Sequence, residues 1–354
     1  MPKSPPITQN NFLAASMKIL LIYTGGTIGM VHNKQSEAYV PFDFENLQNQ
    51  IPELNQLDCS LEVLSYDPSI DSSNMQTKIW IQLAKTIESS YADYDGFVIL
   101  HGSDTMAFTA SALSFMLEGL NKPVVLTGSQ LPSGVPRTDA KENLITAIEI
   151  AASEKNGLPE VPEVSLYFEY QLYRGNRTHK SNAENFEAFE SVNYPPLAEA
   201  GVHLKFNRRY VQKKLNESLT VHTKLNTRIG VLKIFPGMTN DYVQHLLENP
   251  KTEAFILETF GVGNAPTFPW FLELIKEAIG RGQLIFNVSQ CNGGSVELGR
   301  YETSKSLKEL GVLSAYDMTF EAALTKLMFV MGYTNNAVKR KTLLESNLQG
   351  ECTR

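Results

Sequence analysis

Short apolar runs alternate with segments of helical periodicity along the first half of the chain. The runs are typical of strands buried on both faces, and they lie at 18–24, 96–102, 123–129 and 163–168. Helical patterns occur at 105–120 and 141–153, and Asp139 and Glu142 are placed as an N-terminal capping pair for the second. Strands and helices that alternate in this way form a parallel sheet with helices on both faces. The pattern predicts an α/β domain with a doubly wound, mainly parallel sheet.

The alternation stops at 201–227, a basic and polar stretch with scattered apolar positions that we interpret as a linker. It then resumes in segments of similar length: 229–235, 241–249, 253–260, 268–282, 283–289 and 320–333. A chain of 354 residues also exceeds the ~250–300 residues at which single cores usually stop growing. The sequence therefore predicts an N-terminal domain at 17–200 and a smaller C-terminal α/β domain at 228–350.

Composition says more about the possible binding partners and the location of the protein than about its fold. The net charge of −7 argues against nucleic acid, because phosphate binding needs a basic surface. The first sixteen residues lack the apolar core of a signal peptide, and no run of ~18 apolar residues predicts a membrane span. Three cysteines far apart in the sequence indicate a reduced, cytoplasmic chain. The histidines show no ligand spacing, so we expect no metal site.

Ligands of open α/β sheets bind outside the carboxyl ends of the strands. Four polar loops belong at that edge: 24–29, 71–75, 101–105 and 127–130. The side chains that they bring together are mostly hydroxyls: Thr27, Ser72, Ser73 and Ser103, with the carboxylate of Asp104. A hydroxyl becomes a good nucleophile only when a base or a charge network activates it. The topology thus predicts a candidate site built from hydroxyl groups.

The activating group is left open by these residues alone. Lys180, in "YRGNRTHK" after the strand at 163–168, would complete a Ser–Lys type arrangement, whereas the ring of His101 should point away from Ser103. Each feature also has an ordinary structural explanation: a tight turn for the glycine loop, an N-cap for Ser103 or Asp104, and a surface position for Lys180. Only the conjunction of the loops favours a site.

Five motifs together resemble those of the bacterial type I, cytoplasmic L-asparaginases. They are "TGGTIGM", "DSSNM", "ILHGSDTMAFTASALSFML", "YRGNRTHK" and "FGVGNAP", and their order and spacing match over roughly residues 17 to 350. The resemblance implies an enzyme that hydrolyses L-asparagine to L-aspartate and ammonia through a threonine acyl-enzyme, without a metal or organic cofactor. It also implies a homodimer or a dimer of dimers.

The resemblance carries roles over to matching residues. Thr27 matches the nucleophile, and Tyr39, in "AYVPF", matches the mobile tyrosine that lies over it. Asp71, Ser72 and Ser73 match the segment that holds the α-carboxylate and α-amino groups of the substrate. This assignment would place the scissile amide against Thr27.

A second polar group follows from the same resemblance. Asp104 matches the aspartate that binds the α-ammonium group, and Ser103 and Lys180 match the threonine and lysine of a second polar triad. Ser103 is a departure, because relatives usually carry threonine there; serine keeps the hydroxyl and loses a methyl group. The group that takes the proton of Thr27 stays open between Lys180 and Tyr39.

Two rival functions share this scaffold. An amidotransferase subunit that supplies ammonia for glutaminyl-tRNA synthesis carries an additional N-terminal domain, for which sixteen residues before the first strand leave little room. A non-catalytic asparagine-binding sensor would not need Thr27, Asp104 and Lys180 together. We therefore expect an enzyme.

Some type I relatives bind a second asparagine that activates them cooperatively, through an arginine, a threonine and a cysteine. The matching positions here hold Glu258, His179 and Cys291. A carboxylate in place of a guanidinium reverses the charge that would face the carboxylate of the effector. His179 is bulkier than threonine and could pair with Glu258. We therefore expect no cooperative activation.

Overall fold

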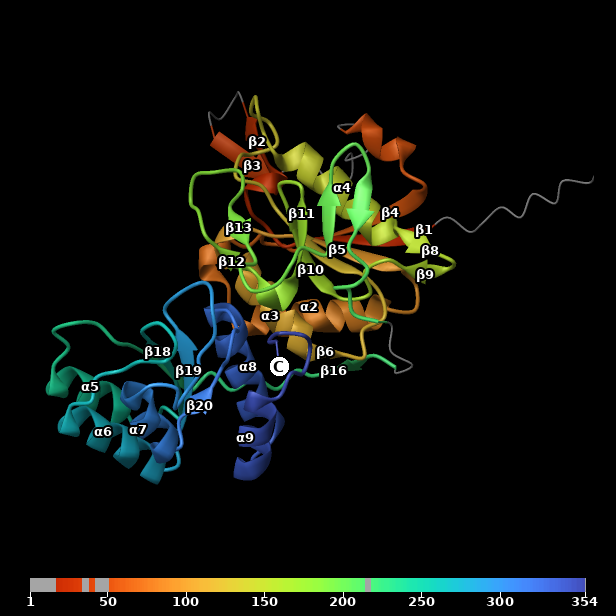
Figure 1. Ribbon diagram of the computed structural model, residues 1–354. Coiled ribbons are helices and arrows are strands. Elements are labelled where there is room, and N and C mark those ends of the chain that lie inside the picture. Colours follow the sequence, from red (N-terminus) through yellow and green to blue (C-terminus); the bar gives the residue numbers. More distant parts are fainter. Residues whose placement is uncertain (1–16, 34–37, 42–50, 214–217, 354) are drawn as a thin grey trace, which may run out of the picture.

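The protein is described here from a computed structural model, which covers residues 17–33, 38–41, 51–213 and 218–353, with backbone only for 31–33 and 38–41. Its first domain is built on an eight-stranded sheet and its second on a four-stranded sheet (Figure 1). None of the helices in these ranges is long and apolar enough to cross a membrane.

The eight-stranded sheet confirms the predicted mainly parallel order. Its strands, from one edge to the other, are β15 (Leu204–Phe206), β14 (Ala198–Ala200), β11 (Gln171–Arg174), β10 (Val164–Phe168), β7 (Val124–Thr127), β5 (Gly96–Leu100), β1 (Met17–Tyr23) and β4 (Cys59–Ser65). The run from β4 to β10 is parallel, and β11, β14 and β15 continue it antiparallel. Because β1 lies between β4 and β5, the chain changes direction across the sheet beside β1, where a ligand crevice is expected.

Helices cover both faces of this sheet (Figure 1): α2 (Thr77–Ser90) and α3 (Met106–Met116) on one side, and α4 (Ala140–Ala152) on the other. Alternate residues of β1 explain the two layers. Leu20 and Ile22 pack into the core under α2 and α3, whereas Ile19 and Leu21 pack into the core under α4. The apolar runs of the sequence thus belong to strands buried on both faces.

The second domain repeats this plan on a smaller scale. Its parallel strands are β17 (Ile229–Lys233), β18 (Ala254–Thr259), β19 (Leu284–Ser289) and β20 (Leu313–Ser314). Its helices are α5 (Asn240–Leu247), α6 (Pro269–Gly280), α7 (Glu302–Leu310), α8 (Phe320–Tyr333) and α9 (Ala337–Glu345). Helices α5, α6 and α7 pack on one face, and α8 packs on the other.

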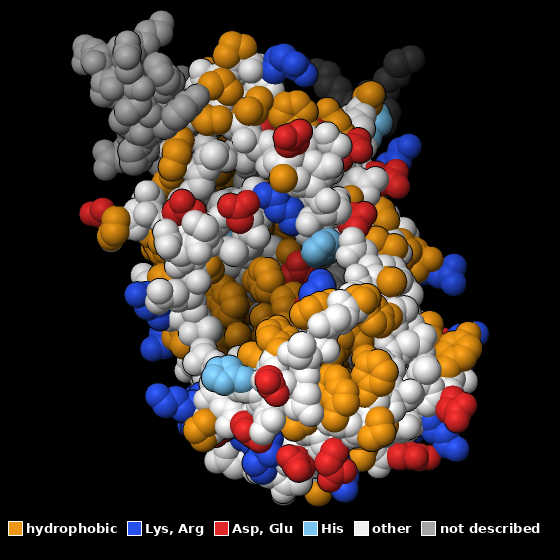
Figure 2. All heavy atoms as spheres, turned by 90° about the vertical axis from the view of Figure 1, so that its left-hand side faces the viewer, with side chains coloured by type: hydrophobic (Ala, Val, Ile, Leu, Met, Phe, Trp, Pro, Cys, Tyr) orange, Lys and Arg blue, Asp and Glu red, His pale blue; other side chains and the backbone are white. Residues whose placement is uncertain are grey.

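The two domains meet along α3 and α8, which lie side by side in Figure 1. The rings of Phe115 and Phe329 stack across this contact at 6.0 Å, and those of Phe108 and Phe320 meet edge to face at 6.1 Å. Figure 2 shows the face on which the second domain lies nearest the viewer: the surface is hollowed between the domains, and hydrophobic side chains line the hollow. Aromatic packing between α3 and α8 therefore contributes to the contact between the domains.

Two local predictions need correction. The helix predicted at 105–120 ends at Met116, because Leu117 and Glu118 form β6, which pairs with β16 (Thr220–Val221). A backbone partner from the predicted linker thus replaces the last helical turn. The predicted linker also supplies β15 to the first sheet. The predicted capping pair is also wrong: the side chains of Asp139 and Glu142 do not cap α4 and instead bind elsewhere.

Several short elements carry the candidate site residues. They are η1 (Thr27–Gly29), β2 (Met30–Asn33), β3 (Ala38–Pro41), η4 (Ser72–Asn74), η5 (Ser103–Thr105), η6 (Gly175–Arg177), β12 (His179–Lys180) and β13 (Phe189–Glu190). The remaining short elements are η3 (Pro52–Gln56), β8 (Glu154–Lys155) and β9 (Leu158–Pro159).

Candidate active site

The glycines of the first loop allow three loops to approach one another beside β1. A Cβ on Gly25 would lie 2.0 Å from the carbonyl oxygen of Ile70, and a Cβ on Gly26 would lie 2.6 Å from the Cα of Gly102. Both glycines also have positive φ, at 141° and 93°, which side chains disfavour. The "TGGT" loop therefore brings Thr27 against the loops that follow β4 and β5, as the topology predicted.

Thr27 begins η1, and its hydroxyl is half-buried. Its Oγ1 donates a hydrogen bond to the carbonyl oxygen of Ser129, at 2.6 Å, in the loop after β7. A carbonyl can orient a hydroxyl but cannot remove its proton, so activation of Thr27 requires another group. Tyr39 lies in β3, which pairs with β2 directly after η1. The side chain of Tyr39 lies outside the described part of the chain.

The "DSSNM" segment lies at the same edge. Asp71 caps η4, and its carboxylate accepts hydrogen bonds from the backbone N–H of Ser73, at 2.9 Å, and from the hydroxyl of Ser73, at 2.7 Å. These bonds lower the pKa of Asp71 below its usual value. Ser72 is buried against Gly102. A Cβ on Gly102 would lie only 2.5 Å from the Oγ of Ser72. Ser72 thus belongs to the packed loop cluster, whereas Asp71 and Ser73 remain exposed.

Lys180 meets Ser103 and Asp104, as the sequence predicted. Its Nζ donates to Ser103 Oγ at 2.9 Å and to Asp104 Oδ1 at 2.7 Å. The Lys180 side chain is 17% exposed, whereas that of Asp104 is 64% exposed, so its carboxylate can also receive a ligand. Neither Ser103 nor Asp104 caps α3, whose N-cap is Thr105. The ordinary explanation of these two residues as helix caps is therefore wrong.

His101 takes no part in this network. Its Nδ1 lies 2.7 Å from the carbonyl oxygen of Gly102, which can only accept, so Nδ1 carries the hydrogen. Its Nε2 then accepts from the hydroxyl of Thr109 in α3, at 2.9 Å. Complete burial lowers the pKa of His101 to about 4. The ring is a neutral part of the core and points into α3 rather than toward Ser103, as expected.

Gln130, in the loop at 127–130, is a site residue that the sequence did not indicate. Its Oε1 accepts from Ser103 Oγ at 3.4 Å, and its backbone N–H donates to Asp139 Oδ2 at 2.8 Å. Asp139 also accepts from the backbone N–H of Leu131 and from the Nδ2 of Asn143. Its carboxylate therefore holds the site loop instead of capping α4.

Glu142, the other half of the predicted cap, serves a different contact. It accepts hydrogen bonds from the hydroxyl of Thr146, at 2.9 Å, and from that of Tyr167, at 2.6 Å. Both partners lie in the first domain, on α4 itself and on β10. The carboxylate thus fastens α4 to the sheet, which explains why it does not turn back to the start of the helix.

The predicted pairing of His179 with Glu258 is also wrong. His179 Nδ1 lies 2.7 Å from Glu321 Oε1 in the first turn of α8, and this hydrogen bond raises the pKa of His179. Glu258, at the end of β18, pairs instead with Lys233 of β17 at 3.2 Å. Cys291 is exposed in the loop after β19. Each of the two substituted residues therefore has its own partner.

Two models of known protein families match this chain. The family model for the N-terminal domain of asparaginases matches residues 18–212, and the model for the C-terminal domain of glutaminases and asparaginases matches residues 228–344. The chain belongs to the asparaginase family. The matched ranges include the loops described above, from Thr27 to Lys180.

Individual relatives match 95% or more of this asparaginase-family chain. L-asparaginase 1 of Escherichia coli strain K12 is 43% identical over 95% of this chain and 98% of its own length. The 60 kDa lysophospholipase of Mus musculus is 40% identical over 95% of this chain and 62% of its own length. The crystal structure of L-asparaginase I from Vibrio cholerae is 41% identical, covers 96% of this chain and 100% of that chain, and has a TM-score of 0.87.

The site of this asparaginase-family member combines a hydroxyl, an amine and a carboxylate. Over the described ranges, no group of three or more histidine, cysteine, aspartate or glutamate side chains could hold a metal ion. The residues present suit a ligand with its own ammonium group, because the carboxylate of Asp104 is accessible.

Proposed function

We propose that this enzyme is an L-asparagine amidohydrolase that uses Thr27 as its nucleophile. The observation that carries the proposal is the contact of Lys180 with both Ser103 and Asp104, beside the loop that holds Thr27. These residues come from distant parts of the sequence and meet near β1, where the chain changes direction across the sheet. The nearly end-to-end similarity to L-asparaginase 1 of Escherichia coli supports asparagine as the substrate.

Substrate binding follows from the charges of the site. L-Asparagine is a zwitterion with an amide side chain. Asp104, 64% exposed, would accept the α-ammonium group, and the segment of Asp71, Ser72 and Ser73 would hold the α-carboxylate, as the resemblance implies. These contacts would position the amide carbon against the hydroxyl of Thr27. Orientation of this kind lowers the barrier because the reacting atoms no longer have to find one another.

The reaction would proceed in two steps. The Oγ1 of Thr27 attacks the amide carbon, the C–N bond breaks, and ammonia leaves with the proton of the hydroxyl. Water then attacks the ester, releases L-aspartate and returns a proton to Thr27. Backbone N–H groups of the glycine loop can approach the developing oxyanion closely. Lys180 and Tyr39 are the two candidates for moving the proton.

The proposal extends to assembly and location. By resemblance to type I asparaginases, we infer a homodimer or a dimer of dimers in the cytoplasm. Light scattering on the purified protein measures this directly: a mass of one chain would contradict the inferred assembly without affecting the inferred reaction.

Ammonia release from L-asparagine by the purified protein tests the activity. An enzyme releases ammonia and L-aspartate in equal amounts over many turnovers. A binding protein without catalysis would instead bind asparagine in a calorimetric titration and release no ammonia. That result would favour the asparagine sensor, the alternative function on this scaffold, and would contradict the proposal.

A further inference from the structure

The loop that carries Lys180 receives little support from the main sheet. After β10 the chain turns back along β11, so η6 lies at the other end of β10, where a Cβ on Gly175 would lie 3.0 Å from the carbonyl oxygen of Val164. Lys180 itself lies in β12, which pairs with β13 in a separate two-stranded sheet. On the first domain η6 packs against α3, where Ser111 Oγ donates to the carbonyl oxygen of Gly175 at 3.5 Å. The position of the Lys180 amine therefore depends in part on what else holds η6, three residues earlier.

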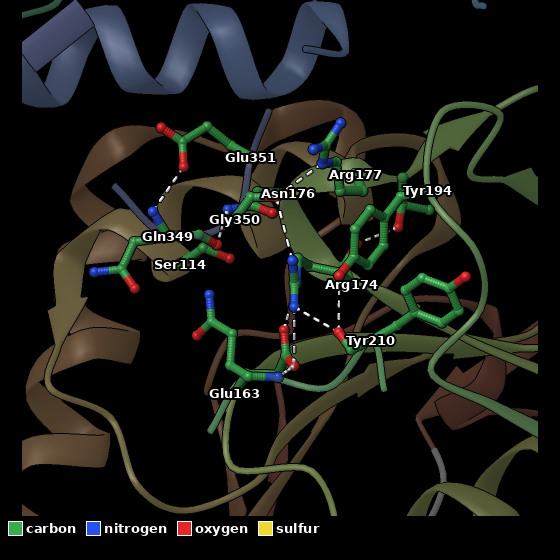
Figure 3. A network of polar contacts seen from close by, with 12 residues as sticks. Ser114, Glu163, Arg174, Asn176, Arg177, Tyr194, Tyr210, Gln349, Gly350 and Glu351 are labelled. Carbon is green, nitrogen blue, oxygen red and sulfur yellow. Dashed lines mark hydrogen bonds and ion pairs between the residues drawn. The ribbon is translucent and has the colours of Figure 1, made fainter. Parts of the chain in front are cut away.

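A segment that follows α9, residues 347–353, holds η6 (Figure 3). Three hydrogen bonds join them: Asn176 Nδ2 to Gln349 O at 2.9 Å, Arg177 Nε to Gly350 O at 2.8 Å, and Arg177 Nη2 to Thr353 Oγ1 at 3.1 Å. We call residues 347–353 the clasp segment. It bonds to both long side chains of η6, and to Arg177 twice.

Arg177 is the centre of this contact. Its guanidinium is almost completely buried, and its Nη1 lies 2.9 Å from Asp317 Oδ2. The other oxygen of Asp317 accepts from the backbone N–H of Thr353, at 2.8 Å. The ring of Tyr194 covers the guanidinium, 5.0 Å from its Cζ. Because the guanidinium is planar and its N–H groups are fixed in direction, these partners determine its orientation as well as its position.

The clasp segment is itself anchored in the second domain. The carboxylate of Glu351 lies 2.6 Å from the amine of Lys326 in α8, and both side chains are fully buried. Glu351 also accepts from the backbone N–H groups of Leu348 and Gln349. The neighbouring Cys352 packs in the core beside α8. Arg177 is thus connected to the buried core of the second domain.

Arg174, next to η6, provides a contrast. Its Nε lies 2.7 Å from Glu163 Oε2, and its Nη2 donates to the carbonyl oxygen of Tyr210 at 2.8 Å, both within the first domain (Figure 3). Arg174 therefore fastens β11 mainly to its own sheet, and its Nη1 adds a longer bond to the carbonyl oxygen of Gly350 at 3.4 Å. Arg177, whose charged partner Asp317 lies in the second domain, fastens the start of the Lys180 loop to that domain.

We propose that Arg177 is a positioning residue for the hydrolysis. Held by Asp317 and the clasp segment, it fixes η6 so that Lys180 reaches Ser103 and Asp104. Three residues of chain span at most about 10 Å, so a shift of η6 passes directly to Lys180. The inference rests on the role proposed above for Lys180.

A double substitution removes the contacts of the Arg177 guanidinium without leaving a buried charge unpaired. A chain carrying both Arg177→Met and Asp317→Asn should bind substrate nearly normally but turn it over slowly: kcat falls about tenfold to hundredfold, and KM changes less than about threefold. The amine of Lys180 should also react faster with an acetylating reagent, measured by mass spectrometry of its peptide, because its two partners no longer hold it. The milder Thr353→Val change should also lower kcat and raise the acetylation rate of Lys180. If the double variant does not fold, Thr353→Val replaces it in the test.

A matched variant separates positioning from stability. Ile275→Ala truncates a fully buried side chain of α6, far from η6 in the core between the sheet and α5–α7. It should lower Tm while kcat and the reactivity of Lys180 stay unchanged. If the double variant loses Tm but keeps the wild-type kcat and reactivity, Arg177 only stabilises the fold and the inference is wrong. Lys180→Met in the same assay tests the role of Lys180 separately. A wild-type kcat in the Lys180→Met variant would contradict the role proposed for Lys180 itself.

Discussion

The hydroxyl of Thr27 is the group on which the proposed chemistry depends. Thr27→Ala should abolish ammonia release and leave the fold intact, because loss of a covalent nucleophile typically costs several orders of magnitude in kcat. Ammonia release and circular dichroism measure the two parts of this prediction. Thr27→Ser, which keeps the hydroxyl, is the matched variant and should retain part of the activity. Residual turnover above about 1% in Thr27→Ala would point to a different nucleophile.

His101 should make the stability of the protein depend on pH. Burial lowers its pKa to about 4 from an ordinary value near ~6.5, so between these pH values the unfolded chain binds a proton that the folded chain excludes. The free energy of unfolding should therefore fall as pH decreases through this window, by an amount on the order of 3 kcal/mol.

Urea unfolding at a series of pH values measures this dependence. His101→Gln removes the ionisable group, so the variant should lose less stability than the wild type between pH ~6.5 and ~4. The same substitution at the exposed His245 is the control. Parallel stability curves for His101→Gln and the wild type would show that His101 is not the group responsible.

The loop after β1 places a strict steric demand on Gly26. Gly26→Ala would set a Cβ 2.6 Å from the backbone of Gly102, at a φ of 93°. We expect a loss of roughly 2–5 kcal/mol in the free energy of unfolding, together with most of the activity, because the loops that hold Thr27 and Asp104 must separate. Gly237→Ala is the matched control, since Gly237 has a φ of 90° and open space around it. Equal losses in the two variants would assign the cost to backbone strain alone.

The elements of the first sheet could be predicted because their signal is local. A strand buried on both faces needs an unbroken apolar run, and the four runs of the first half became β1, β5, β7 and β10. The end of α3 could not be predicted, because Leu117 leaves the helix to pair with Val221, more than a hundred residues away. The sequence also could not show that Asp139 would leave α4 uncapped. Its partners, the backbone N–H groups of Gln130 and Leu131, are set by tertiary structure.

Lys180 illustrates both the strength and the limit of the sequence. The motif resemblance placed it with Ser103, beside Asp104, and the structure confirms the contact with both. Its support could not be foreseen, since Arg177 binds a segment some 170 residues later and nothing in "YRGNRTHK" indicates that partner. Local patterns specify which side chains face a site, whereas the contacts that hold the backbone behind them are distributed over the whole chain.

The two domains share polar contacts as well as the aromatic contact of α3 with α8. His179, directly before Lys180, pairs with Glu321 of α8 at 2.7 Å. Asn193 donates to the carbonyl oxygens of Gly294 and Asp317, at 3.1 and 3.0 Å. The loop that supplies Lys180 is thus bonded to the second domain on both sides. Movement between the domains would displace the site, so we expect the pair to act as one rigid unit.

The contacts of His179 and Glu258 also affect whether a second asparagine could regulate the enzyme. The resemblance to type I asparaginases implies that some members bind a second asparagine near the active site, with its carboxylate against an arginine. Here that position holds Glu258, whose side chain is 12% exposed and pairs with Lys233. The neighbouring position holds His179, which is engaged with Glu321. A second asparagine would lose a bidentate guanidinium partner and would have to approach a carboxylate.

The rate should therefore depend hyperbolically on asparagine concentration, with a Hill coefficient of one. Initial rates from well below to well above KM test this prediction, and calorimetric titration of the Thr27→Ala chain counts the asparagine sites without turnover. One site per chain is the expected result. Lys233→Met removes the partner of Glu258 and leaves its charge unpaired, so it should keep the curve hyperbolic as well. A sigmoidal curve for the wild type, with a Hill coefficient clearly above one, or a second site in the titration would show that an effector binds despite Glu258 and His179.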